Sequence, residues 1–323
     1  MREYHFFTSN SVQSLSQNWF LIALIAPFLW ALIAILDTHF VHGVYEDEYD
    51  GTVISGIFQS LPWILVVFGI VEFTVPETRV MWLALLAGGM FIASFFCYFK
   101  ALFVSNDSAM MQILWNISVL AVPFFAWLLI GEVLTTLHYA GIGVAFIGIS
   151  LFHFGGKTSR IRFSKVMIPM IGAIVFLSLS MVITKSIQEP GADFWSIFLV
   201  FSSGATITSL LILLIGKKNP LKRAKEIMAL SRIYFIFFFL SELLSNVATI
   251  TSQRAISLSP AVSFVAVLET LVPVFVMMIS LLIVLAFRNT KILDVTPFRN
   301  QVSGWEIKIL ALALIAIGIS IVA

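Results

Sequence analysis

Ten apolar stretches, each of about 18 residues or more and so long enough to cross a bilayer as a helix, divide this chain of 323 residues. Backbone groups in hydrocarbon must be satisfied within the protein, which favours helices. The stretches are continuous rather than alternating, which disfavours a β-barrel. We therefore predict an all-α integral membrane protein with ten transmembrane helices, at residues 19–37, 53–72, 80–103, 108–131, 135–154, 165–187, 195–216, 231–256, 260–287 and 305–322.

The composition fits a chain that lies mostly in lipid. Hydrophobic residues make up 60% of it and charged residues only 11%, whereas a soluble domain carries about 25% charged residues. The single cysteine, Cys97, excludes an intrachain disulfide and a cysteine metal site. The net charge of +2 gives no reason to expect nucleic acid. Residues 1–18 are polar, and the first apolar stretch lacks a cleavage pattern, so we interpret it as a retained span.

The order of features along the chain indicates two similar halves. The segment YFKALF at Tyr98–Phe103 resembles TSQRAI at Thr251–Ile256, and FIGIS at Phe146–Ser150 resembles AIGIS at Ala316–Ser320. Five spans is an odd number, so the second half is expected to be inverted relative to the first, with a central cavity between them. We predict a polar tail at 1–18, a first five-helix repeat at 19–154, a basic linker at 155–164 and a second repeat at 165–323.

The loop charges bear on the orientation in the membrane. With ten spans, fifteen Lys and Arg residues fall on the side of the loops that follow the odd-numbered spans, and four fall on the other side. The positive-inside rule then places both termini outside. The first loop on the basic side, however, is the acidic stretch Tyr45–Asp50.

Two carboxylates lie where hydrocarbon is expected. Glu242 falls within the eighth apolar stretch and Glu269 within the ninth. An acid at that depth costs roughly 2.5–3.5 kcal/mol on insertion scales and tends to face a protein interior or a water-filled cavity. Four residues after Glu269, Pro273 leaves the Glu269 carbonyl without its helical donor, which predicts a kink. The alternative for Glu269 is a buried structural acid that is paired with a neighbour.

Further polar and aromatic side chains accompany these acids. Asn246 follows Glu242 by one helical turn, so both share a face that either lines a cavity or joins helices by hydrogen bonds. Gln112 and Asn116 show the same spacing in the fourth span, with the same two interpretations. Trp30 and Trp115 are candidates for aromatic walls of a binding site. We interpret Asp37 as an interfacial acid at the end of the first span. A small-residue stripe, Gly141, Ala145 and Gly148, predicts close packing of the fifth span, with Ala311 and Gly318 as its counterparts in the tenth.

The chain resembles the EamA-like branch of the drug/metabolite transporter superfamily over nearly its whole length. The resemblance lies in Trp30 of the first span, in YFKALF, in the Gly131-Glu132 ending of the fourth span, and in RAISLSPAVSFVAVLETLVPVF of the second half. Pro123 falls about one turn later than the family pattern, and the second half lacks the Gly-Glu ending. The resemblance implies ten helices around a central substrate cavity, with both termini cytoplasmic, which is opposite to the orientation indicated by the loop charges.

These observations favour a secondary carrier of a small polar or amphipathic metabolite or drug, working by alternating access with proton coupling or exchange. We expect a multi-pass protein of a prokaryotic plasma (inner) membrane, with the bilayer, the small-molecule substrate and protons as its partners. Neither a GxxxxGK[ST] loop nor HExxH occurs in the sequence, so we expect no ATPase, metal, cofactor or enzyme activity. A membrane scaffold or sensor that does not transport is the alternative. The candidate substrate- or ion-binding residues are Glu242, Glu269, Asn246, Gln112, Asn116, Trp30 and Trp115.

Overall fold

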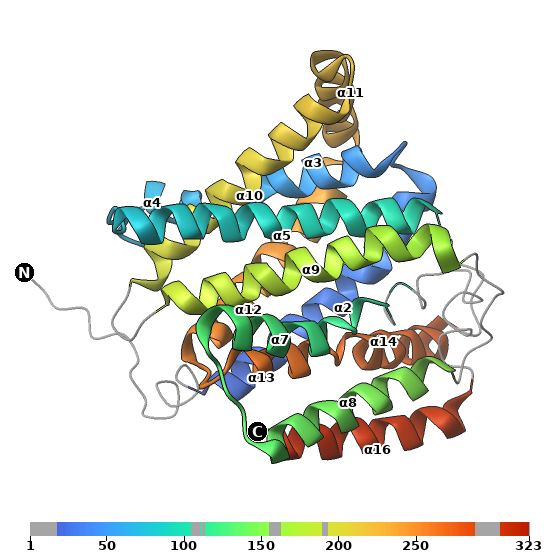
Figure 1. The fold of residues 1–323 in the computed structure, drawn as a ribbon. Coiled ribbons are helices and arrows are strands. Elements are labelled where there is room, and N and C mark those ends of the chain that lie inside the picture. Colours follow the sequence, from blue (N-terminus) through green and yellow to red (C-terminus); the bar gives the residue numbers. More distant parts are fainter. Residues whose placement is uncertain are drawn as a thin grey trace, which may run out of the picture.

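The computed structural model describes residues 18–104, 111, 114–154, 163–188, 193–287 and 304–322, and all regular structure in these ranges is helical (Figure 1). The first part of the chain forms α2 (Trp19–Gly43), α3 (Glu48–Phe58), α4 (Trp63–Val67), α5 (Thr78–Val104), α7 (Ser118–Ile130) and α8 (Thr136–Phe154). The second part forms α9 (Phe163–Ile187), α10 (Phe194–Gly216), α11 (Pro220–Ile233), α12 (Phe235–Leu258), α13 (Val262–Glu269), α14 (Val272–Phe287) and α16 (Trp305–Val322). The predicted tail, the basic linker and the loop Arg288–Glu306 lie largely outside the described residues.

Seven helical segments of the described chain are long and apolar enough to cross a membrane, and α7 and α8 are shorter apolar helices. The predictions of an all-helical chain and of several membrane-spanning segments are therefore confirmed. The seven segments are Trp19–Asp37, Glu48–Val67, Thr78–Val104, Lys165–Ile187, Phe194–Gly216, Phe235–Leu258 and Val262–Phe287.

Polar side chains begin several helices where the sequence changes from polar to apolar. The Asn18 side chain accepts hydrogen bonds from the backbone N–H groups of Phe20 and Leu21 at the start of α2. Asp47 caps α3 and Asp193 caps α10 in the same way. Such caps satisfy N–H groups that have no partner within the first helical turn.

Two of the predicted spans are interrupted. The span predicted at 53–72 is divided into α3 and α4, and Pro62, which has no N–H to continue the α3 ladder, lies between them. The span predicted at 260–287 is divided at Thr270–Leu271, and Pro273 follows two residues after Leu271. The expected kink beside Glu269 is therefore present as a complete break.

Two further boundaries differ from the sequence-based expectation. Helix α2 continues to Gly43, six residues beyond the predicted end of the first span at Asp37, so Asp37 lies within a helix rather than at its end. The basic stretch Lys217–Arg232, most of which falls between the spans predicted at 195–216 and 231–256, contains the separate helix α11 before α12 begins. Hydropathy identifies lipid-crossing stretches, and a helix can continue past the apolar run where its side chains find polar partners.

The helices pack in pairs that join distant parts of the sequence (Figure 1). Helices α8 and α16 lie side by side, α5 packs against both α9 and α10, and α2 packs along α12. Helix α7 contacts α9 and α13, while α13 and α14 contact α2. Every one of these pairs joins the first part of the chain to the second.

Small residues allow the closest of these contacts. A Cβ atom on Gly88 of α5 would lie 1.9 Å from the carbonyl oxygen of Phe201 in α10. Between α8 and α16, a Cβ on Gly148 would lie 2.9 Å from the Ala311 carbonyl oxygen, and one on Gly318 would lie 2.6 Å from the Ala145 nitrogen. The predicted small-residue stripe therefore lies at the contact between these two helices.

Candidate functional site

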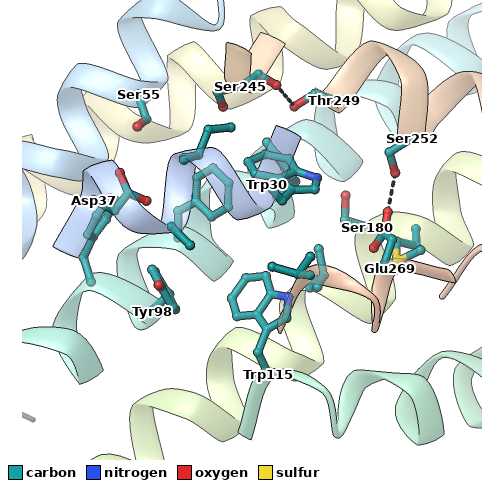
Figure 2. A pocket seen from close by; sticks show the side chains of 18 of the residues that line it. Trp30, Asp37, Ser55, Tyr98, Trp115, Ser180, Ser245, Thr249, Ser252 and Glu269 are labelled. Atoms are coloured by element: carbon teal, nitrogen blue, oxygen red, sulfur yellow. Dashed lines mark hydrogen bonds between the residues drawn. The ribbon is translucent and has the colours of Figure 1, made fainter. Parts of the chain in front are cut away.

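A partly enclosed cavity lies among the helices of both parts of the chain and encloses about 970 Å³ of empty space, its open mouth included (Figure 2). Its walls come from α2, α3 and α5 in the first part and from α9, α12, α13 and α14 in the second, with Trp115 between them. The lining residues are Trp30, Ile33, Ala34, Asp37, Ser55, Phe91, Phe95, Tyr98, Phe99, Trp115, Leu177, Ser180, Met181, Glu242, Ser245, Thr249, Ser252, Gln253, Glu269 and Val272.

Glu242 is the acid that α12 contributes to the cavity. Its side chain is 5% exposed, and its Oε1 atom accepts a hydrogen bond of 2.7 Å from the Oγ of Ser55 in α3. Its second oxygen, Oε2, has no hydrogen-bond partner among the described residues. A buried carboxylate oxygen without a donor is costly, so this atom marks a place where a ligand or a proton would be stabilised.

Glu269 lies at the break between α13 and α14. Its Oε1 accepts a hydrogen bond of 2.5 Å from the Oγ of Ser252 in α12 (Figure 2). Ser252 belongs to the same α12 face as Glu242, along with Ser245 and Thr249. Helix α12 thus carries polar groups along the length of the cavity. The break between α13 and α14 brings a second acid, Glu269, to the part of the cavity that is far from Glu242.

Asp37 is the third acid of the cavity, which is a correction to its sequence-based interpretation as an interfacial residue. Its carboxyl group is near enough to Glu242 for the two to repel each other electrostatically. The pKa of the buried Tyr45 phenol lies well above its usual range, first because of burial and then because of the negative charges of Asp37, Glu242 and Asp50. Asp37 and Glu242 therefore form one acidic end of the cavity.

Aromatic rings form most of the apolar wall. Trp30 of α2 lies 5.8 Å from Phe95 and 6.4 Å from Phe91, centroid to centroid, and these two α5 rings are 4.7 Å apart. The ring of Tyr98 lies 5.2 Å from that of Trp115. The lining residues Phe91, Phe95 and Tyr98 of α5 recur at helical spacing on one face of the helix. This pattern could have been found from the sequence, although such aromatic stripes more often belong to a hydrophobic core.

The lining residues include three acids and no lysine, arginine or histidine. Two basic residues near the ends of α9 and α12 are engaged elsewhere. Lys185 Nζ donates to the carbonyl oxygens of Ile256 and Ser259 at the end of α12, and Arg254 lies over the ring of Phe194. None of the residues that line the cavity is therefore a basic partner for its three acids.

The remaining predicted residues occupy different places. Trp30, Trp115, Glu242 and Glu269 line the cavity together. Asn246 does not line it, and its Nδ2 donates to the carbonyl oxygens of Phe58 and Glu242. Asn116 lies in the turn before α7, buried, with its Nδ2 unpartnered among the described residues. Gln112 lies outside the described residues.

A charged cluster binds α11 to the connection between α2 and α3. Arg223 of α11 pairs with Asp50, with Glu46 at 2.6 Å and with Glu226 at 3.1 Å, and Lys217 pairs with Asp47. Burial lowers the pKa of Arg223, but the hydrogen bond that its guanidinium donates to Glu46 and the charge of Asp50 outweigh this effect, so its pKa is raised. The acidic and basic stretches of the sequence thus neutralise each other.

Within the described residues, no group of three or more His, Cys, Asp and Glu side chains is arranged to hold a metal ion. The three cavity acids lie on different helices, with Glu269 away from the Asp37 end in Figure 2. The lining of the site is acidic and aromatic.

Comparisons with known proteins bear on the fold. No family model matches the chain, and no curated protein matches it. Among solved structures, 28 chains match. One crystal structure superposes with a TM-score of 0.63 at 17% sequence identity, over 94% of this chain and 96% of the other. At that identity the likeness shows a shared fold and nothing about activity.

Proposed function

We propose that this protein is a secondary carrier that moves a small organic molecule across a membrane by alternating access. The observation that carries the proposal is the cavity itself, which places the membrane-depth acids Glu242 and Glu269 in one space between the two parts of the chain. Acids at membrane depth typically mark substrate, ion or proton pathways.

We further propose that the ten predicted spans form two inverted repeats, as in other secondary transporters. The pairing of helices supports this. Helix α2 (the first span) packs on α12 (the eighth), and α9 (the sixth span) packs on α5 (the third). In an inverted repeat the first span corresponds to the sixth and the eighth to the third, so the two contacts are equivalent. The fifth and tenth spans, α8 and α16, pair with each other.

The interrupted spans give a second argument for the repeat. The fourth span has a turn at Asn116–Ile117, and the ninth span has one at Thr270–Leu271. These spans hold equivalent positions in the two five-helix halves. Broken helices at equivalent positions are typical of transporters whose site lies at the repeat interface. Membership of the EamA-like branch remains a proposal that rests on the sequence motifs.

The acids suggest how transport is coupled. Unneutralised carboxylates are costly in a low-dielectric interior, so an unloaded cavity would resist the rearrangement that exposes it to the other side. A proton or a cationic group on Glu242 and Glu269 removes that cost and permits the rearrangement. Proton coupling and exchange of one substrate molecule for another both follow from this requirement.

The test begins with a thermal-shift screen of the purified protein against pools of metabolites. A compound that raises the melting temperature is then assayed for uptake into proteoliposomes, with and without a pH gradient. Glu242→Gln and Glu269→Gln should abolish gradient-driven uptake, whereas the exposed Glu77→Gln should leave it unchanged. Unchanged uptake in both cavity variants would refute the coupling role, and failure of the wild-type protein to move any stabilising compound would refute the carrier.

A further inference from the structure

We propose that the cavity binds an elongated organic cation with an amino group at each end, an α,ω-diamine or a linear polyamine. One ammonium group would be held by Asp37 and Glu242 and the other by Glu269. This inference rests on the proposed carrier function and names the substrate class of the same cavity.

The acids form two separate ends. Glu242 and Ser252 are ten residues apart on the continuous helix α12, which corresponds to about 15 Å along its axis. The Glu269 carboxylate is hydrogen-bonded to Ser252, so it lies near that far position. At the other end, Asp37 lies near Glu242. Figure 2 shows Asp37 and Glu269 on opposite sides of Trp30.

The first end has room for a donor that the described residues do not supply. Glu242 Oε2 is buried, borders the cavity and has no partner among the described residues. Asp37 supplies a second carboxyl group at this end of the cavity. An ammonium group, which offers three N–H donors and a positive charge, would satisfy both carboxylates at once.

The space between the ends suits a hydrocarbon chain. Trp30, Phe91 and Phe95 form a continuous aromatic wall, and Tyr98 packs on Trp115 beside it. Aromatic faces pack well against methylene groups and also attract cations that lie over them. An inorganic cation would find no oxygen ligands along this wall, and the carboxylates at the two ends are too far apart to share one ion.

The separation of the ends sets the length of the ligand. If the helical rise of about 15 Å between positions 242 and 252 is taken as the separation of the two ends, about 3 Å at each end is taken by a charge-assisted hydrogen bond. About 9 Å remains between the two nitrogens, which corresponds to a chain of roughly six methylene groups at ordinary covalent dimensions. A shorter diamine reaches only one acidic end.

The test is calorimetric binding of unbranched diamines, from ethanediamine to decanediamine, to the full-length protein in detergent at one pH and ionic strength. Alkyl monoamines of matching length serve as controls. We expect the affinity to rise to a maximum near hexanediamine to octanediamine, and the matched monoamine to bind at least about tenfold more weakly because one charged contact is lost. A monoamine that binds as tightly, an affinity that is independent of chain length, or no binding by any diamine would overturn the inference.

Variants locate the two ends. Glu242→Gln and Glu269→Gln should each lower the affinity for hexanediamine by about tenfold or more, and Glu77→Gln should not. Wild-type affinity in both cavity variants would contradict the proposal, and the ligand series on the wild-type chain decides the question if a variant does not fold.

The binding measurement needs no vesicle, so the carrier proposal and the diamine proposal can fail separately. If diamines bind as expected but radiolabelled hexanediamine is not exchanged across proteoliposomes, the carrier fails; if another compound is carried and no diamine binds, only this inference fails.

Discussion

The Oγ atom of Ser55 in α3 donates a hydrogen bond of 2.7 Å to Oε1 of Glu242 in α12. This contact joins two residues 187 positions apart and fixes one oxygen of the carboxylate. The other oxygen borders the cavity without a partner among the described residues. The first part of the chain thus positions the acid, and the second part presents it to the cavity.

Removing the Ser55 hydroxyl should loosen this arrangement. We expect Ser55→Ala to lower stability by about 1–3 kcal/mol, because a buried carboxylate loses its donor, and to lower the melting temperature in detergent accordingly. In a double-mutant cycle, Ser55→Ala should cost much less in the Glu242→Gln background. Ser60→Ala, at an exposed position, serves as the control. Additive effects of the two cavity substitutions would show that the contact has no energetic role.

The charged cluster around Arg223 should matter more than its surface position suggests. Its partner Asp50 is 1% exposed, so Arg223→Gln leaves a buried carboxylate unpaired and should cost about 3–5 kcal/mol. Adding Asp50→Asn should restore a large part of the loss, measured by unfolding in detergent. Lys222→Gln, which removes an exposed pair with Glu226, should change stability by less than about 1 kcal/mol. A loss that Asp50→Asn does not reduce would argue against the pairing.

Glu132 should hold the start of α13. Its carboxylate accepts hydrogen bonds from the backbone N–H groups of Val262, at 2.9 Å, and Ser263, at 3.3 Å. We expect Glu132→Ala to cost about 0.5–2 kcal/mol, as the loss of a helix cap does, and to speed amide hydrogen exchange in residues 262–269. Glu77→Ala is the matched control. Unaltered exchange in α13 would show that the cap is dispensable.

Two glycines test the close contact between α8 and α16. A Cβ on Gly318 would lie 2.6 Å from the Ala145 nitrogen, whereas one on Gly143 meets nothing within 4 Å. Glycine-to-alanine substitution in a helix with space available stabilises by about 0.4–1 kcal/mol. We therefore expect Gly143→Ala to raise the melting temperature and Gly318→Ala to lower it. The same sign for both would contradict the packing described.

Sequence periodicity located the acids better than it located their neighbours. Glu242 and Glu269 were identified because an acid inside an apolar run is rare and costly. Asn246 lies one turn from Glu242, yet its amide bonds the Phe58 carbonyl instead of bordering the cavity. A helical face is broad, and spacing alone does not say which of its residues points at a neighbouring helix and which at a cavity.

Asp37 was misplaced for a different reason. The apolar run ends at Asp37, and the sequence therefore suggested an interfacial acid, but α2 continues to Gly43. The packing of α2 on α12, a contact between residues far apart in the chain, brings this acid into the cavity that Ser55 and Glu242 also line. Hydropathy is a property of neighbouring residues in the sequence and does not report such contacts. The same limit hid α11, whose Arg223 is paired with Glu46 before α3 and with Asp50 within it.

The central claim, a cavity that opens to each side of the membrane in turn, is tested most directly by the reactivity of a cysteine at Ser245. This residue lines the cavity, whereas Val247, on the same helix, is 40% exposed on the outer surface. In a Cys97→Ala background reconstituted in vesicles, a charged, membrane-impermeant thiol reagent is applied from one side and then the other. The account expects Ser245→Cys to react from both sides, more slowly when hexanediamine is present, and Val247→Cys to stay unreactive. A Ser245→Cys protein that reacts from one side only, or from neither, would contradict alternating access.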